Sequence, residues 1–300
     1  MRTCLRRWVG ASAVAVVAAG AGLGAWGLWL EPSSLRVRSH ELWLEHWPAE
    51  CDGLRVAVLA DLHVGAPFLG VERLVEIVEA VRGAQPRLIL LAGDYVVQGV
   101  VGGAHVPAEP IARGLGPLGA IAPVYAVLGN HDWWDDGARM TAALTSVAIA
   151  VLEDASARVD LGDCTFWLAG ISDVFTRPHD VDRALEAVPP GRPTIALTHN
   201  PDVFVRVPVG VALTVAGHTH GGQVSIPWFG PPIVPSRYGR RYARGEVREQ
   251  HRTLFVSSGI GTSILPVRLL VPPEISLLEL RSCVVGPSAP PYCGEKSTRR

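Results

Sequence analysis

The sequence predicts an α/β fold, with one domain over residues 54–280. Strand-length apolar runs rich in Val, Ile and Leu recur along this stretch, and such runs are typical of buried strands. Helical segments fall between them, of which residues 71–81 carry apolar side chains along one face. Several runs stop abruptly at glycine or polar residues, as strands do at the carboxyl edge of an open sheet. A domain of this length can bury a large core.

Five of the apolar runs end in residues that can bind metal or transfer protons. The runs cover residues 56–60, 88–92, 124–128, 194–198 and 211–216, and the polar residues after them are Asp61, His63, Asp94, Asn130, His131, His199, His218 and His220. One such stretch could be an ordinary turn, because Asn, Asp and Gly are turn residues. Five of them indicate one sheet edge that collects ligands for a shared metal centre. These residue types suit Mn, Fe, Zn and Mg, and seven candidate ligands suit two ions, as in sites that displace groups at phosphorus.

The order of these motifs resembles that of the calcineurin-like metallophosphoesterases. It consists of Asp-x-His at 61–63, Gly-Asp at 93–94, Gly-Asn-His-Asp at 129–132, an isolated His at 199 and Gly-His-x-His at 217–220. The resemblance covers the stretch from about Leu54 to Leu280. Three further stretches, 198–202, 217–223 and 257–263, look like the bacterial membrane-anchored phosphodiesterase branch of that family.

The resemblance implies a fold and a set of roles. The fold would be a four-layer α/β/β/α sandwich, in which two packed mixed sheets are flanked by helices. Two divalent metal ions would be held, the first by Asp61, His63 and His220, the second by Asn130, His199 and His218, with Asp94 bridging both. His131 would face the substrate, protonating the leaving oxygen or stabilising charge on the phosphoryl group, while a metal-bound hydroxide would be the nucleophile.

One position departs from the family pattern. The family often reads Gly-Asp-x-x-Asp, and its second Asp supports the catalytic His from behind, whereas Val97 stands at that position here. The departure leaves the metal ligands untouched but puts the orientation and pKa of His131 in doubt. Loss of such a partner can lower activity or metal affinity about 10- to 100-fold.

The amino-terminal residues 1–30 predict a transmembrane anchor. Arg2, Arg6 and Arg7 precede an uncharged run over residues 8–30, which as a helix would be roughly 34 Å long and would span a bilayer core. A cleaved signal peptide is the alternative. The arginines before the run favour a cytoplasmic amino terminus. We therefore expect a single-pass protein of the cell membrane with an extracytoplasmic catalytic domain.

The remaining segments follow in order. Residues 31–53 are expected to form a juxtamembrane connector with an edge strand at 34–43, and residues 281–300 a disordered tail. Expected helices at 138–147 and 181–188 and short strands within 158–169, 254–257 and 275–280 complete the domain. The five cysteines have no metal-ligand spacing, and their odd number argues against a full disulfide framework, although Cys283 and Cys293 could pair.

Four residues are candidates for substrate binding. Trp133 and Trp134 follow the 129–132 motif and could wall in a substrate or pack under the loop. Arg240 and Arg241 belong to a basic loop that begins shortly after His220 and could grip a phosphate or anionic lipid, or simply be solvated. The net charge of −1 and the absence of a nucleic-acid motif argue against a nucleic-acid partner.

Together these features predict a membrane-anchored dinuclear-metal phosphoesterase that hydrolyses phosphodiester or phosphomonoester bonds. The location favours a lipid-linked or cell-envelope substrate, such as a glycolipid pyrophosphate. An amidase or peptidase on the same ligand types is disfavoured because no His-Glu-x-x-His stretch is present. A catalytically weakened metal-binding module of the same fold is the alternative, since Val97 leaves room for it. The sequence leaves the metal identity and the oligomeric state open.

Overall fold

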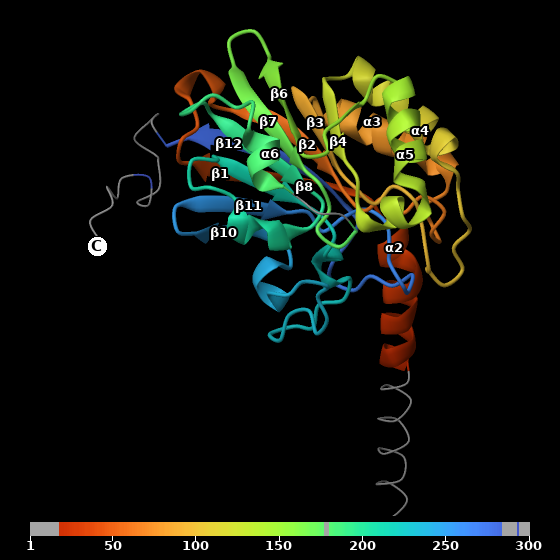
Figure 1. Ribbon diagram of the computed structural model, residues 1–300. Helices are drawn as coiled ribbons and strands as arrows, with labels where there is room; N and C mark the ends of the chain where they lie inside the picture. Colours follow the sequence, from red (N-terminus) through yellow and green to blue (C-terminus); the bar gives the residue numbers. More distant parts are fainter. Residues whose placement is uncertain (1–17, 177–179, 284–292, 294–300) are drawn as a thin grey trace, which may run out of the picture.

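Two six-stranded sheets pack face to face in the structure, a computed structural model that describes residues 18–176, 180–283 and 293 (Figure 1). The first sheet has the strand order β1-β12-β2-β3-β4-β5, and the second has the order β10-β11-β9-β8-β7-β6. Each sheet mixes parallel and antiparallel pairs. The predicted pair of packed mixed sheets is therefore confirmed.

The strands of the first sheet are β1 (Arg36–Leu44), β2 (Leu54–Leu59), β3 (Leu88–Ala92), β4 (Val124–Val127), β5 (Ala150–Val151) and β12 (Glu274–Ser282). Those of the second are β6 (Ala155–Asp160), β7 (Thr165–Ile171), β8 (Thr194–Thr198), β9 (Leu213–Ala216), β10 (Gly245–Glu249) and β11 (Arg252–Val256). Strands β2 to β5 run parallel, as do β7, β8, β9 and β11, so their carboxyl ends meet at common edges.

Alternate side chains of the central strands point to different cores. Val56, Val58 and Leu90 face the second sheet, where they pack with Leu168 and Ile195. The residues between them face helices α3 (Leu74–Ala84), α4 (Ala108–Leu115) and α5 (Asn130–Ser146), which cover the outer face of the first sheet. Because both faces of these strands are buried, the sequence shows continuous apolar runs instead of alternation.

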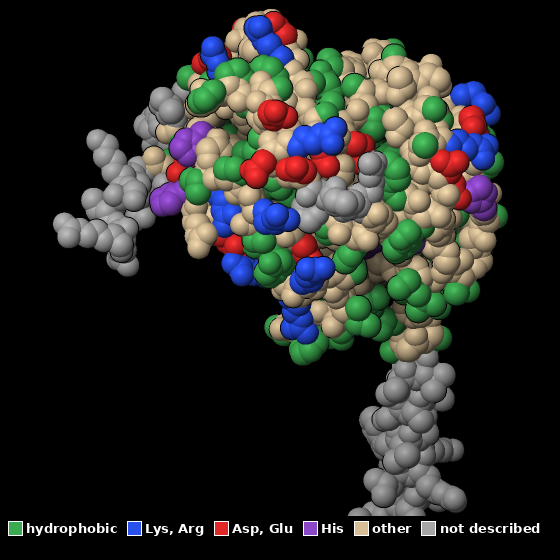
Figure 2. Space-filling model, viewed as in Figure 1, with side chains coloured by type: hydrophobic (Ala, Val, Ile, Leu, Met, Phe, Trp, Pro, Cys, Tyr) green, Lys and Arg blue, Asp and Glu red, His purple; other side chains and the backbone are tan. Residues whose placement is uncertain are grey.

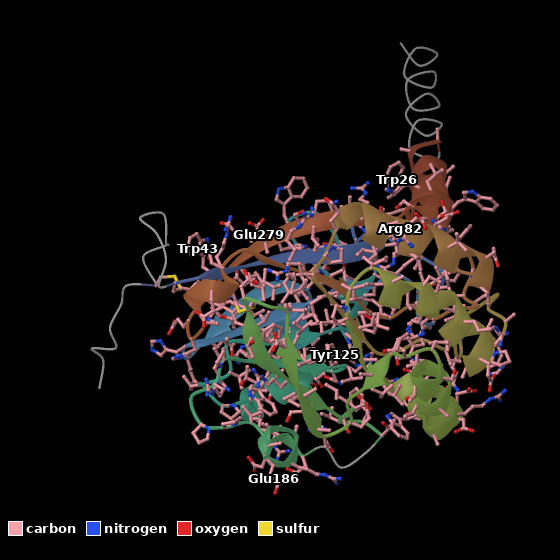
Figure 3. The ribbon with its side chains drawn as sticks, turned by 90° about the horizontal axis from the view of Figure 1, so that it is seen from above. Trp26, Trp43, Arg82, Tyr125, Glu186 and Glu279 are labelled. Atoms are coloured by element: carbon pink, nitrogen blue, oxygen red, sulfur yellow. A yellow bond between two sulfur atoms is a disulfide. The ribbon has the colours of Figure 1, made fainter. Side chains whose placement is uncertain are left out.

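The fourth layer of the sandwich is thin. Helix α6 (Val181–Leu185) and a 3-10 helix at Pro201–Arg206 cover the second sheet through a small apolar cluster that includes Val181, Ala196 and Val203. The helix expected over 181–188 therefore ends after Leu185. In Figure 3, Arg82 of α3 and Glu186, just after α6, lie on opposite sides of the two sheets, with Tyr125 of β4 between them.

The expected connector, residues 31–53, belongs to the folded domain instead. Strand β1 pairs along its whole length with β12, from Arg36 opposite Glu274 to Leu44 opposite Ser282. Leu42 and Leu44 are buried against the second sheet. The predicted edge strand is thus present, and its buried side chains make it an integral strand of the first sheet.

The amino-terminal anchor prediction falls mainly on residues 1–17, outside the described residues. Residues 18–33 are helical, with a π-helical stretch at Trp26–Leu30, and the segment leaves the domain on the side where the 223–237 loop protrudes (Figures 1 and 2). Within the described part of the chain, no helix combines the length and apolar character needed to cross a membrane. Of the expected disordered tail, residues 284–292 and 294–300 also lie outside the described residues.

Two disulfides are present, Cys51–Cys164 and Cys283–Cys293. Cys51 lies before β2 and Cys164 before β7, so the first bond joins the two sheets at the amino ends of their strands. Trp47 packs beside it on Phe166, with ring centroids 5.2 Å apart. The pairing of Cys283 with Cys293 matches the sequence expectation, whereas the Cys51–Cys164 bond was not predicted.

Candidate metal centre

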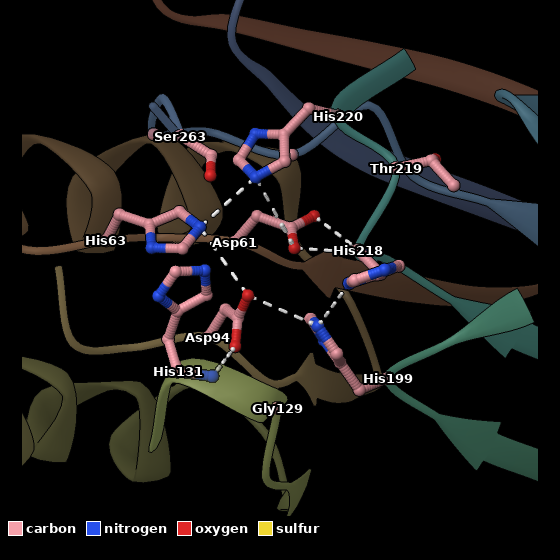
Figure 4. Close-up of polar contacts among 12 residues, drawn as sticks. Asp61, His63, Asp94, Gly129, His131, His199, His218, Thr219, His220 and Ser263 are labelled. Atoms are coloured by element: carbon pink, nitrogen blue, oxygen red, sulfur yellow. Dashed lines mark hydrogen bonds and ion pairs between the residues drawn. The ribbon is translucent and has the colours of Figure 1, made fainter. Parts of the chain in front are cut away.

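All seven predicted ligands converge at the carboxyl ends of five strands, β2, β3 and β4 from the first sheet and β8 and β9 from the second. Figure 4 labels six of them, all but Asn130. They are Asp61, His63, Asp94, Asn130, His199, His218 and His220, and all are buried. Two of the groups that they form, Asp61–His63–His220 and Asp94–His199–His218, have ligand atoms within 4.8 Å of one another. Parallel strands from two sheets thus deliver one cluster.

Asp94 lies between the two halves of the cluster. Its Oδ2 atom is 3.6 Å from His63 Nε2 on one side and 3.2 Å from His199 Nε2 on the other. On the first side, His63 Nε2 is 3.1 Å from His220 Nε2, which is 3.9 Å from Asp61 Oδ1. On the second side, His199 Nε2 is 3.2 Å from Asn130 Oδ1 and 3.1 Å from His218 Nδ1. This grouping matches the one that the family resemblance implies.

The donor set fits divalent cations. His63 Nδ1 and His199 Nδ1 lie 3.2 and 2.8 Å from the carbonyl oxygens of Val96 and Ala92. A ring that donates Nδ1–H to a carbonyl presents the Nε2 lone pair to the cluster, as metal-ligating histidines do. His63 Nε2 and His220 Nε2 lie 3.1 Å apart, close enough for both nitrogens to bind one cation. The residues therefore fit such ions, whose number and identity the donor set leaves open.

The electrostatics of the cluster favour the ligating forms of most residues. Burial lowers the pKa of His63 to about 4 and that of His218 to about 3, so these imidazoles are neutral at pH 7. Burial opposes ionisation of Asp94, but His199 and His63 hold the pKa of its carboxyl well below the usual range. Burial alone would lower the pKa of His199, yet Asp94 and Asp61 raise it to about 10. The cluster thus attracts positive charge.

Several ligands are held in left-handed backbone conformations. Asp61, His63, Asp94, His218 and His220 have φ angles of 53°, 44°, 57°, 70° and 51°. Such conformations are uncommon outside glycine and concentrate at functional sites. Main-chain bonds hold them, including Asp61 N–H to Gly93 O at 3.0 Å.

Two glycines allow the ligand loops to approach each other. A Cβ at Gly93 would lie 2.5 Å from the Gly129 nitrogen, and one at Gly129 would lie 2.1 Å from Asp94 Oδ1. Both positions therefore require glycine.

Asp132 organises the loop that carries Asp94, a role not predicted from the sequence. Its buried carboxylate accepts four backbone N–H groups, from Asp94 and Tyr95 at 2.8 Å, Gly129 at 2.9 Å and Val96 at 3.1 Å. Burial, together with the nearby Asp94 carboxylate, raises the pKa of Asp132 to about 7, and the N–H donors oppose that rise. One side chain thus links the loops after β3 and β4.

Arg268 is a second residue that the sequence did not single out. Its guanidinium is fully buried, donates to the carbonyl oxygens of Gly261, Ser258 and Val271, and lies 3.5 Å from His220 Nδ1. Burial lowers the pKa of Arg268 to about 10, which still leaves it cationic at pH 7. A single arginine within the apolar stretch 264–273 was the available signal.

His131 lies beside the cluster, and one of its ring nitrogens has no hydrogen-bond partner among the described residues. Its backbone N–H donates to Asp94 Oδ1 at 2.9 Å, and its ring packs between His63 and Trp134, with centroids 4.8 and 4.9 Å away. Nδ1 is buried, and no hydrogen-bond partner for it exists among the described residues. Val97 packs in an apolar cluster with Ala66 and Val100. Burial lowers the pKa of His131 below its usual value.

A cavity of about 640 Å³ opens over the cluster. Its floor includes Asp94, Asn130, His131, His218 and His220, whereas its walls are largely apolar, with Trp134, Phe175, Ile233, Pro235 and Ile264. The sequence reasoning missed Phe175, Ile233 and Ile264, which lie far from the motifs along the chain.

Of the four predicted substrate contacts, Trp134 borders the cavity and the other three do not. Trp133, on α5 like Trp134, packs half-buried against the core of the first sheet and its helices. Arg240 donates to the carbonyl oxygens of Phe229 and Pro231, and Arg241 pairs with Glu249, so neither arginine borders the cavity.

Several known proteins are similar to this chain in sequence. The sequence model of the calcineurin-like phosphoesterases matches residues 54–222, more than half of the chain. The uncharacterized metallophosphoesterase YkuE of Bacillus subtilis is 28% identical over 94% of this chain and 97% of its own. Phosphodiesterase YaeI of Escherichia coli is 30% identical over 92% of this chain and 98% of its own. The UDP-2,3-diacylglucosamine pyrophosphatase LpxG of Chlamydia trachomatis is 27% identical over 89% of this chain and 96% of its own. The chain therefore belongs to the calcineurin-like phosphoesterase family and is a metal-dependent phosphoester hydrolase.

Proposed function

We propose that this protein is a membrane-anchored phosphoesterase that uses two divalent metal ions and hydrolyses a lipid-linked phosphate ester. The observation that carries the proposal is that four of the seven ligands, Asp94, Asn130, His218 and His220, lie at the floor of a cavity whose walls are largely apolar. A polar floor suits a phosphoryl group, and apolar walls suit the hydrocarbon part of an amphiphile.

The residues of the site fall into two groups, those that would bind the metal ions and those that would contact the substrate. Asp61, His63 and His220 would hold one ion and Asn130, His199 and His218 the other, with Asp94 shared. When bound, two such ions polarise the phosphoryl oxygens and lower the pKa of a water molecule. His131 lies next to this floor and is suited to protonate the leaving oxygen. Asp132 and Arg268 position the ligands from behind.

Two observations support a lipid-linked substrate in preference to a small soluble ester. The cavity walls formed by Phe175, Ile233 and Ile264 offer no charge to a polar leaving group. In addition, the relative LpxG is named as a pyrophosphatase of a diacylated sugar nucleotide. A glycolipid pyrophosphate is the substrate class that joins these observations.

Placement at the outer side of a membrane has separate support. The described helical segment carries Leu23, Trp26, Leu28, Trp29 and Leu30 exposed on its surface. Disulfides persist in oxidising compartments and are rare in the cytosol, and this chain has two. Both features fit an anchored domain that faces the outside of the cell.

A catalytically weakened metal-binding module is the second candidate. Val97 at the position of the usual carboxylate and the unpartnered Nδ1 of His131 favour it. The two candidates agree on metal binding and differ in turnover.

The test uses the full chain in detergent. Bound metal is quantified, and hydrolysis of a chromogenic monoester, a chromogenic diester and a diacylated UDP-sugar is measured with added Mn, for the wild type, Asp94→Ala and His131→Ala. His105→Ala is the matched control, because His105 is an exposed histidine paired with Asp135.

We expect about two bound ions, loss of metal and activity in Asp94→Ala, and loss of activity alone in His131→Ala. If the wild type bound metal but hydrolysed none of the three substrates, the weakened metal-binding module would be the better description of this protein. If only the soluble esters were hydrolysed, the proposal of a lipid-linked substrate would be wrong.

A further inference from the structure

Two loops at the mouth of the cavity expose large apolar side chains. In the 223–237 loop, Trp228 is 104% exposed, Ile233 77% and Phe229 56%, and in the 263–270 loop, Ile264 is 72% exposed and Leu265 52%. Ile233 and Ile264 also line the cavity, so the exposed tips continue into its walls. Apolar side chains that protrude together at a surface mark a site that contacts a membrane, a ligand or another protein.

Backbone and side-chain bonds hold the two loops side by side. Val224 forms a β-bridge with Leu269, and the Gln223 side chain bonds both ways with the backbone of Ser263, at 2.9 and 2.6 Å. The Val101 N–H donates to Ile264 O at 3.0 Å and adds a third loop to the same rim. The tips therefore form one defined surface, which we call the rim surface: Trp228, Phe229, Ile233, Ile264 and Leu265.

Arg240 braces this surface from behind. Its guanidinium lies 4.0 Å from the centroid of the Phe229 ring and donates to the carbonyl oxygens of Phe229 and Pro231, at 2.7 and 2.8 Å. Residues 221–245 contain four arginines, Arg237, Arg240, Arg241 and Arg244, and no Asp or Glu. Arg241 pairs with Glu249, so the other three arginines give the support of this surface an excess of positive charge. Figure 2 shows hydrophobic and basic side chains on the lower part of the molecule, where the 223–237 loop lies.

The helical segment is joined directly to the same rim. The Arg268 N–H donates to Gly27 O at 2.9 Å, and the Val271 N–H donates to the buried Glu31 carboxylate at 2.6 Å. Trp29 packs edge-on to Phe68, with centroids 5.5 Å apart. The segment and the 223–237 loop protrude on one side of the molecule (Figure 1).

We propose that the rim surface docks on a lipid bilayer, with its apolar tips at the boundary between head groups and acyl chains and its arginines near anionic head groups. Trp and Phe are favoured at this depth, and arginines add attraction to anionic lipid. The excess of arginines in residues 221–245, the protruding tips and the continuity with the apolar helix favour a bilayer over a protein partner. The inference rests on the membrane location in the proposed function.

Docking in this manner would place the cavity mouth against the lipid surface. An amphiphilic phosphate ester could then present its phosphoryl group to the metal ligands while its hydrocarbon chains pass along Ile233 and Ile264 and stay within the bilayer. The exposed apolar rim would thereby select substrates that are themselves lipids.

The test measures the depth of Trp228 in the full chain. The protein carries Trp228→Cys in a Cys4→Ser background, because the other four cysteines are disulfide-bonded, and is spin-labelled in vesicles of phosphatidylcholine with phosphatidylglycerol. Collision with oxygen, which concentrates in lipid, is compared with collision with a water-soluble nickel chelate. Arg158→Cys on β6, on the opposite side of the domain, is the control.

We expect oxygen to dominate at position 228 and the chelate to dominate at position 158. If the protein floated with the vesicles but the chelate reached both positions, docking of the rim surface would be wrong while the anchor stood. The rim surface would then be expected to bind a protein partner. Protein that fails to float would overturn docking and anchor together, whereas hydrolysis of soluble esters tests the enzyme separately.

A second measurement compares two probe substrates in the same vesicles. The double variant Trp228→Ser/Phe229→Ser is expected to lower kcat/KM for hexadecyl p-nitrophenyl phosphate about tenfold, a loss of about 1.4 kcal/mol of binding. It should leave kcat/KM for ethyl p-nitrophenyl phosphate unchanged, because neither residue lines the cavity. An equal loss on both substrates, or none on either, would contradict docking.

Discussion

The carboxylate of Asp132 is the most stringent point at which to test how the cluster is built. Replacement by Asn keeps the shape and one oxygen but turns the other oxygen into an NH₂ group. Two of the four buried N–H donors at 2.8–3.1 Å then lose their acceptor and face a second donor. Because each orphaned buried N–H costs about 1–3 kcal/mol, the free energy of unfolding should fall by about 2–6 kcal/mol.

That loss is a large part of the stability of a typical domain, which is about 5–15 kcal/mol. It corresponds to a fall in Tm of roughly 5–20 °C for a domain of this size. Urea unfolding of the detergent-solubilised protein, followed by tryptophan fluorescence and circular dichroism, measures it. Metal content should fall as well, since Asp132 holds the backbone of Asp94.

Asp136→Asn provides the matched control. Asp136 lies at a kink inside α5 and is exposed, and its carboxylate accepts the Arg139 N–H, a bond that an Asn side chain can also make. The free energy of unfolding of Asp136→Asn should equal that of the wild type. If Asp132→Asn lost less than about 1 kcal/mol, the four donors would have found water or new partners, and the role assigned to this carboxylate would be wrong.

Three further outcomes are expected. Cys51→Ser/Cys164→Ser should lower the free energy of unfolding by up to about 4–5 kcal/mol, since the bond closes 113 residues; equal urea midpoints for variant and wild type would refute this. Chelation by EDTA should lower Tm and excess Mn should restore it, because an ion at a hundred times its Kd contributes about 2.7 kcal/mol, whereas Asp94→Asn should not respond. Val97→Asp restores the carboxylate of the family pattern and should raise kcat up to about tenfold if that carboxylate reaches His131 Nδ1, which has no partner among the described residues. Val97→Thr is the control, and unchanged kcat would show that position 97 does not support His131.

The sequence predicted the parts of this protein that depend on local pattern. Continuous apolar runs gave the central strands because both of their faces are buried, and the polar residues after each run gave the seven ligands because parallel strands end at one edge. The sandwich itself came from the resemblance, since periodicity alone predicted only α/β. The sequence could not show how thin the fourth layer is, because a five-residue helix has too few turns for a clear stripe.

The missed features depend on contacts between distant segments. No spacing rule pairs Cys51 with Cys164 across 113 residues. Asp132 is the last residue of the 129–132 motif, but its four N–H partners come from the loops after β3 and β4, which the sequence does not show to be close together. Arg240 and Arg241 follow His220 closely along the chain, yet Arg240 bonds its own loop and Arg241 bonds Glu249, so nearness in sequence did not bring them to the cavity.

The two sheets are joined at both ends of their strands, covalently by Cys51–Cys164 at the amino ends and by the shared cluster at the carboxyl ends. This arrangement gives the assembly of the protein an order. Four ligands come from the first sheet and three from the second, so ions bind well only after the sheets have met. Closing the disulfide first shortens the search for that meeting. Metal loading should therefore follow oxidation, and a chain kept reduced during synthesis should acquire its ions slowly.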